Sequence, residues 1–139
     1  MDWKNLYLSL DGRINRKPFW LGVVVFAVVT WILEFILFAT FGVSVIPNID
    51  PNADPAAAAA AASAMMGKMT VPLIILTLII LWPAICLYAK RWHDRGKSGW
   101  WSLITFVPII GSIWLLVELG FLRGTEGPNR FGPDPLAGQ

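Results

Sequence analysis

The stretch FWLGVVVFAVVTWILEFILFATFGVSVI, residues 19–46, decides the fold, because it runs for 28 residues with Glu34 as its only charge. A helix needs about 20 apolar residues to cross the hydrocarbon core of a bilayer. Two further stretches share this character: MTVPLIILTLIILWPAICLYA at 69–89, and the segment 98–122, whose only charge is Glu118. The sequence therefore predicts a small membrane protein with three apolar helical segments.

The composition supports this interpretation. Hydrophobic residues make up 56% of the 139 residues and charged residues only 14%, and the mean hydropathy is +0.62. So apolar a surface suits lipid better than water. The formal charge of +2 is too small to indicate nucleic-acid binding. The single cysteine, Cys86, lies inside the second stretch, and we expect its side chain to be buried as a small hydrophobic group. We expect one integral membrane domain over residues 1–139, with no cofactor.

Basic residues flank the apolar stretches unevenly. Lys68 is the only lysine or arginine between the first and second stretches; all the others precede the first, fill the turn after the second or follow the third. By the positive-inside rule, the N-terminal segment 1–18 and the turn 90–99 are cytoplasmic, and the loop 47–68 is outside. The first stretch is too long for the apolar part of a signal peptide and is expected to stay as a span.

The third segment, residues 100–122, has two interpretations. Its centre contains Pro108 and Gly111, which respectively remove a backbone donor and loosen a helix. A kinked span, which its length favours, would place the Gly- and Pro-rich tail 123–139 outside. A re-entrant hairpin would return the tail to the basic side.

Shorter elements complete the predicted fold. Residues Trp3, Leu6, Tyr7 and Leu10 recur at helical spacing, which predicts a short amphipathic helix at the headgroup level. In the outer loop, Asp54 before a proline and an alanine run predict a helix that projects outward or lies on the outer surface, and that could run towards span two with bends at Gly67 and Pro72. The expected fold class is thus an all-α membrane bundle of three apolar segments, the third kinked or re-entrant, with an N-terminal interfacial helix.

The densest polar cluster is the turn from Lys90 to Trp101. Cations beside tryptophans attract anionic lipid by about 1 kcal/mol per charge near the surface, although the same residues also serve as a topology anchor and a tight turn. We place Trp92 at this interface as well. The candidate headgroup or phosphate contacts are Arg13, Arg16, Lys17, Lys90, Arg91, Arg95, Lys97, Trp100 and Trp101.

Glu34 is the second candidate site. It lies about 15 residues into its stretch, roughly 22 Å along a helix, and a carboxyl at such depth often marks a proton or ion pathway. A protonated carboxyl bonded to Thr77, Tyr88 or a backbone carbonyl is the alternative. Glu118 lies near the end of its segment, where an interfacial pair with Arg123 suffices.

No catalytic constellation is evident. His93 and Asp94 are adjacent and so do not face each other on a helix, and Ser98 lacks a nucleophile elbow. With one histidine and a buried cysteine, no metal site is expected. If the tail returns to the basic side, one composite polar site could form from His93, Asp94, Asn129, Arg130 and Asp134.

Three blocks of sequence carry a resemblance: residues 12–20 with Gly12-Arg13, Arg16 and Phe19-Trp20; Arg91 to Trp101; and Gly124-Thr125 to Pro135. Together they resemble domain-of-unknown-function family 805, which are small bacterial inner membrane proteins. The alanine-rich loop departs from the family's usual short connection. The resemblance implies a multi-span protein of the bacterial inner (plasma) membrane and no known activity.

Three functions follow, in order of preference. The first is a non-enzymatic structural or regulatory protein whose basic, aromatic cytoplasmic surface contacts anionic phospholipid or a protein partner. The second is a small proton- or cation-coupled transporter or channel component that uses Glu34. The third is an enzyme acting on lipid headgroups. Small residues at Gly22, Gly42, Gly111 and Gly120 offer helix contact points, so a homo-oligomer is a further hypothesis.

Overall fold

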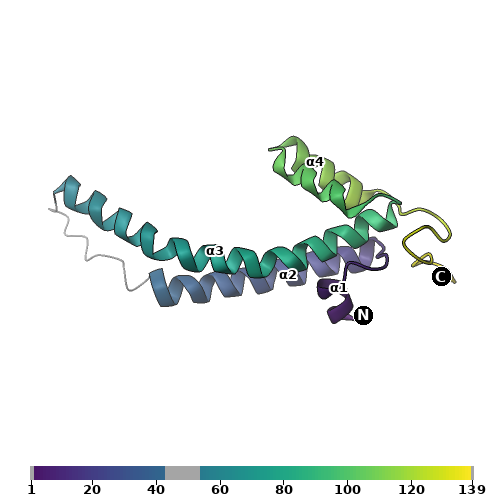
Figure 1. Ribbon diagram of the computed structural model, residues 1–139, viewed down its shortest axis with the longest axis horizontal. Coiled ribbons are helices and arrows are strands. Elements are labelled where there is room, and N and C mark those ends of the chain that lie inside the picture. The colour runs from purple at the N-terminus through teal and green to yellow at the C-terminus, as the bar shows by residue number, and fades with distance from the viewer. Residues whose placement is uncertain (1, 43–53, 139) are drawn as a thin grey trace. The chain divides into compact units, whose positions relative to one another are not determined.

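The computed structural model describes residues 2–42 and 54–138, and the regular structure in these ranges is helical (Figure 1). The first three elements are α1 (Trp3–Leu8), α2 (Arg16–Leu37) and a π-helical turn, η1 (Phe38–Gly42). They are followed by α3 (Pro55–Asp94), the 3₁₀ helix η3 (Gly99–Phe106), α4 (Ile110–Leu115) and the π-helical η4 (Leu116–Phe121). The predicted all-α class is confirmed.

Two of these helices have the length and composition to cross a membrane. They are α2 with its π-helical extension, Arg16–Phe41, and α3, Pro55–Asp94; the apolar helix Ile110–Phe121 is shorter. The end of the predicted first span, residues 43–46, and the start of the outer loop, residues 47–53, lie outside the described residues. We treat residues 69–89 of α3 as its apolar span and 90–94 as its polar end.

Helix α3 begins where the alanine-rich segment does. The carboxylate of Asp54 accepts a hydrogen bond from the backbone N–H of Ala56 at 3.2 Å, which caps a helix that Pro55 can open. From there α3 remains α-helical through Gly67 and Pro72 for 40 residues. The outer helix predicted after Asp54 and the second apolar stretch are therefore one element.

The chain divides into two compact units, Met1–Phe26 with Leu81–Gln139 (unit 1) and Ala27–Ile80 (unit 2). Unit 2 consists of the later part of α2 and the first part of α3, whose large apolar side chains are mostly exposed. Unit 1 contains the core, formed by Leu6, Phe19, Leu87, Trp92 and Leu119. Trp92, which was expected at the interface, has a side chain that is fully buried in this core.

The third apolar segment folds back on itself. It changes direction at Ile109, whose φ of 64° is positive, unlike that of any other non-glycine residue in the described ranges. After this turn, α4 packs against η3 (Figure 1). Gly111 makes this possible, since a Cβ there would lie 1.9 Å from the carbonyl oxygen of Ile104. Of the two interpretations that Pro108 and Gly111 left open, the structure has the hairpin and not the favoured kinked helix.

Three of the four glycines proposed as helix contact points are used inside unit 1. Gly111 supports the hairpin, Gly22 faces Leu87 of α3, and Gly120 faces the indole of Trp20. A Cβ at Gly22 would lie 2.9 Å from Leu87 Cδ1, so a larger residue would require the Leu87 side chain to move. These glycines bring the ends of α2, α3 and η4 close together, and that convergence builds the site described next.

Candidate functional site

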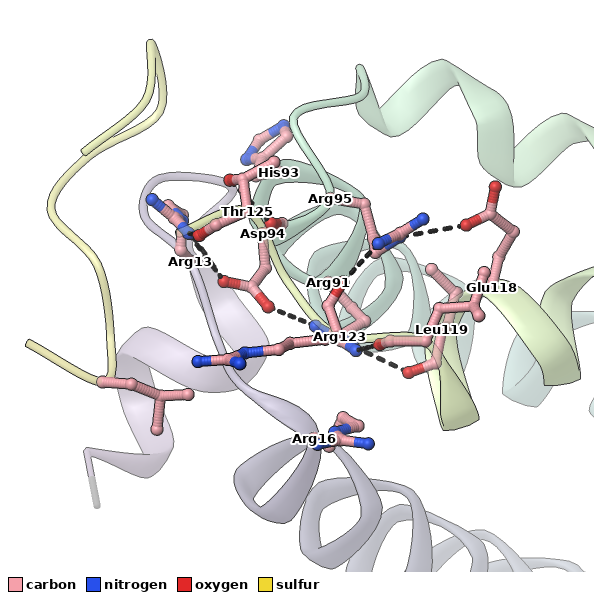
Figure 2. A network of polar contacts seen from close by, with 12 residues as sticks. Arg13, Arg16, Arg91, His93, Asp94, Arg95, Glu118, Leu119, Arg123 and Thr125 are labelled. Atoms are coloured by element: carbon pink, nitrogen blue, oxygen red, sulfur yellow. Dashed lines mark hydrogen bonds and ion pairs between the residues drawn. The ribbon is translucent and has the colours of Figure 1, made fainter. Parts of the chain in front are cut away.

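Asp94, the last residue of α3, is the centre of a buried charge cluster (Figure 2). Arg13 donates from Nε and Nη2 to Asp94 Oδ1 at 3.2 and 3.1 Å, and Arg91 donates from Nη1 to Oδ2. The side chains of Arg13, Arg91 and Asp94 are 1%, 0% and 3% exposed. Two guanidinium groups therefore share one carboxylate in a space closed to solvent.

Arg13 also holds the C-terminal tail. Its guanidinium donates to the carbonyl oxygens of Thr125 at 2.6 Å and Gly127 at 2.8 Å, and more weakly to Gly132 at 3.3 Å. The Thr125 N–H donates in turn to the Asp94 carbonyl at 2.8 Å. Gly124 is required beside this contact, because a Cβ there would lie 2.1 Å from Asp94 Oδ2. The cluster thus joins the N-terminal segment, α3 and the tail.

Arg91 binds the end of the hairpin. The last carbonyls of a helix lack donors within that helix, and at the end of η4 three side chains supply them. Arg91 Nε donates to the Leu119 carbonyl at 2.7 Å, Trp20 Nε1 to that of Gly120 at 3.1 Å, and Arg16 Nη1 to that of Phe121 at 3.1 Å. Cations also suit this negative end of a helix dipole.

Glu118 anchors the hairpin to the basic turn. Its carboxylate accepts a hydrogen bond from Arg95 Nε at 3.0 Å and another from Lys97 Nζ. The Lys97 ammonium also lies over the rings of Trp92 and Trp101, 5.4 and 5.3 Å from their centroids. The predicted pair of Glu118 with Arg123 is therefore wrong.

Arg123 instead contacts Glu126 at 3.0 Å, and both side chains are largely exposed. From the sequence alone, only Arg123 was expected to pair with Glu118, although Arg95 and Lys97 are its partners in the structure. Only the fold-back of the hairpin selects among them.

His93 is held by groups other than its neighbour Asp94. Its Nδ1 lies 3.2 Å from the Gly12 carbonyl oxygen, and its ring stacks on Phe131 at a centroid separation of 3.9 Å. Asn129 Nδ2 donates to the His93 carbonyl at 2.9 Å. Figure 2 shows the imidazole turned away from the Asp94 carboxylate, so the two side chains do not form a catalytic pair.

Two titratable groups of this region are shifted by their surroundings. Burial lowers the pKa of His93 below its usual value, against a smaller opposing effect of its hydrogen bond to Gly12. Backbone N–H groups of Leu136 and Gly127, each 2.9 Å from the Asp134 carboxylate, lower the pKa of Asp134. At neutral pH the imidazole is therefore uncharged and the Asp134 carboxylate ionised.

The composite polar site is assembled around the Asn129 amide. Asn129 bonds to His93 and to Thr125, and Thr125 bonds to Asp94. Arg130 lies over the Phe131 ring at 4.7 Å, and Asp134 closes the turn of the tail. Both oxygens of Asp94 already accept bonds from arginine, so this carboxylate is not placed to act as a general base.

The candidate lipid-contact residues divide into three groups. Arg13, Lys90 and Arg91 turn inward, and Lys90 donates to the Asn5 carbonyl. Arg95 and Lys97 are partly exposed and paired with Glu118. The exposed group consists of Arg16, Lys17, Trp100 and Trp101. Contact with lipid stays a prediction, and the residues of the exposed group are the ones that lipid could reach.

The remaining candidates lie elsewhere or act locally. Glu34 lies exposed on α2 in unit 2, away from this cluster in the sequence, and makes no hydrogen bond or ion pair with residues 2–42 or 54–138. Ser98 caps η3 by accepting from the Trp100 N–H at 3.5 Å. Within the described ranges, no group of three metal-ligating side chains comes together.

A model of the family described as "Protein of unknown function (DUF805)" matches residues 7–133. The chain is 30% identical to the inner membrane protein YhaH of Escherichia coli over 141 residues, covering 97% of both chains. It is 30% identical to the inner membrane protein YhaI of the same organism over 134 residues, covering 95% of this chain and 90% of the relative. No solved structure matches.

The family match spans all three parts of the cluster. Arg13, the α3 end with Arg91 and Asp94, and the tail to Gly132 all fall within residues 7–133. The chain belongs to the DUF805 family, a family of membrane proteins whose function is unknown.

Proposed function

We propose that this protein is a non-enzymatic, structural or regulatory protein of the bacterial inner membrane whose cytoplasmic face binds anionic phospholipid headgroups. The observation that carries the proposal is the division of its cations into two layers. The inner cations are paired with Asp94 or Glu118 or donate hydrogen bonds to backbone carbonyls. An outer layer is exposed: Lys4, Arg16, Lys17, Arg123 and Arg130.

Exposed tryptophans accompany the outer cations in unit 1. They include Trp3, Trp20, Trp100 and Trp101, and Trp100 is 78% exposed. Indole rings favour the boundary between headgroups and hydrocarbon, where each nearby cation gains about 1 kcal/mol from anionic lipid. The acidic residue paired with this outer layer is Glu126, in an exposed contact with Arg123. The surface therefore keeps a positive balance that lipid phosphates can meet.

The proposal requires the N-terminal segment, the basic turn and the tail to share the cytoplasmic side. A chain with Cys86→Ala and Gln139→Cys should react with an impermeant maleimide only after cells are permeabilised. The physical reason is that the tail is held to Arg13 and Asp94, so it cannot reach the far side while those contacts exist. A cysteine at Ala60 in the same background serves as the control and should react in intact cells. Labelling of Gln139→Cys in intact cells contradicts the shared side.

Headgroup binding is tested at three outer cations. In the variant Lys17→Gln, Arg123→Gln and Arg130→Gln, the enrichment of phosphatidylglycerol over phosphatidylethanolamine on the purified protein should fall at least tenfold, because three charges of about 1 kcal/mol each are removed. Native mass spectrometry of lipid-bound protein measures this ratio. The matched control, Lys17→Arg with Arg123→Lys and Arg130→Lys, keeps the charges and should keep the enrichment. Equal enrichment in the glutamine variant would remove the proposal's basis.

A further inference from the structure

A groove runs along the polar end of α3, on the side where the imidazole of His93 points. It encloses about 380 Å³, which lies in the range of small-molecule sites. One wall is formed by Ile85, Ala89 and His93 of α3, and the other includes Gly99, Trp100 and Leu103 of η3. All of these residues belong to unit 1, and the lining is mostly carbon.

The groove is apolar at one end and polar at the other. Ile85, Ala89 and His93 are spaced by four residues and so share one face of α3, about 12 Å from first to last. Ile85 lies within the apolar span, whereas His93 lies at its polar end beside the basic turn. Trp100 lines the groove and is exposed, and tryptophan side chains favour the headgroup boundary of a bilayer. This gradient follows that of a phospholipid, with hydrocarbon at Ile85 and a headgroup at His93.

Contacts at His93 define what its free nitrogen can bind. A backbone carbonyl only accepts hydrogen bonds, so Nδ1 must carry the hydrogen that faces Gly12. In the neutral ring, Nε2 is then an acceptor. Nε2 lies towards Gly99, which also lines the groove; a Cβ at Gly99 would stand 3.8 Å from it. A headgroup at this end must therefore offer an O–H or N–H.

We propose that this groove holds one acyl chain of a bilayer phospholipid whose headgroup donates a hydrogen bond to His93 Nε2. Phosphatidylethanolamine and phosphatidylglycerol have such donors, and phosphatidylcholine has none. The site is separate from the outer cation layer proposed above. That layer selects by charge and favours phosphatidylglycerol over both zwitterionic lipids, whereas the groove selects by donor and favours phosphatidylethanolamine over phosphatidylcholine. The two proposals can therefore fail independently.

The first test is made with full-length protein in detergent, exposed to equal amounts of phosphatidylethanolamine and phosphatidylcholine. Native mass spectrometry should show about fivefold more bound phosphatidylethanolamine, the ratio that one net hydrogen bond supports. His93→Asn keeps a donor near the Nδ1 position and removes the Nε2 acceptor, so the ratio should fall to about one. His93→Gln, which places an amide oxygen near Nε2, should restore part of it. A ratio near one in the unaltered protein, or an unchanged ratio in His93→Asn, overturns the proposal.

The second test blocks the groove. Leu103→Trp places a larger side chain in the wall and should reduce the bound phospholipid of either type at least fivefold. Leu81→Trp is the matched control, because Leu81 is also an exposed leucine of unit 1 but does not line the groove. Equal losses in both variants, or recovery of free fatty acid and no phospholipid from the protein, would also overturn the proposal.

Discussion

Asp94→Asn is expected to lower the free energy of unfolding by about 3–5 kcal/mol, the loss typical when one partner of a buried ion pair is removed. The variant has nearly the same shape but leaves the guanidinium groups of Arg13 and Arg91 buried without a counter-charge. Both arginines also hold backbone carbonyls, so their displacement towards water would release the tail and the hairpin end. The effect should therefore exceed that of any surface charge.

Two measurements check this expectation. Thermal unfolding in mild detergent, followed by tryptophan fluorescence, reports the buried core through Trp92. Trypsin cleavage after the exposed Arg123 and Arg130 reports release of the tail, and should be many times faster in Asp94→Asn. Glu126→Gln is the control, because its pair with Arg123 is exposed and such pairs contribute about 0–1 kcal/mol. Similar behaviour of the two variants would show that Asp94 is not the centre of the cluster.

Gly111→Ala is the second change with a large expected effect. The added Cβ would lie 1.9 Å from the Ile104 carbonyl oxygen, and this neighbour is backbone that cannot rotate away. We expect a loss of about 3 kcal/mol, at the upper end of ordinary overpacking costs. The hairpin should open, which separates Glu118 from Arg95 and Lys97.

Spin labels on the two sides of the hairpin measure its opening. Leu103 and Ile113 are exposed and suit labelling, and their separation should increase in Gly111→Ala. The control is Gly67→Ala in α3, where a Cβ would meet nothing within 4 Å. Alanine is favoured over glycine in a helix by about 1 kcal/mol, so the control should be slightly stabilised. An unchanged label separation in Gly111→Ala would contradict the packing described for α4 and η3.

The sequence predicted those parts of the fold that depend on local information. Apolar runs and their flanking charges were sufficient for the two long helices, and Asp54 marked the start of α3. The path after Pro108 was left open, because a proline and a glycine weaken a helix in the same way whether it kinks or reverses. The close approach of Gly111 to the Ile104 carbonyl accompanies the reversal of the chain. No local sequence pattern predicts this contact.

The candidate site was predicted in part for the same reason. A composite site around His93 and Asn129 was expected only if the tail returned, and the structure brings these residues together. Arg91 was grouped with the lipid-facing cations, since a run of basic residues beside an apolar stretch usually faces water. Its actual partners are the Asp94 carboxylate and the backbone carbonyl of Leu119. A backbone acceptor cannot be predicted from the residue type, because every residue has one.

The contacts of Arg13 can form only late in synthesis, because its partners lie far along the chain. Arg13 leaves the ribosome early, yet its acceptors at Asp94, Thr125 and Gly127 follow 81, 112 and 114 residues later. Contacts so distant in sequence form slowly, because the connecting chain must first be ordered. The guanidinium can therefore be buried with all of these partners only after the chain has been synthesised as far as Gly127. Closure of this cluster thus needs three distant segments of the chain, and we expect a chain truncated before Thr125 to leave the Arg13 guanidinium without its carbonyl acceptors in the tail.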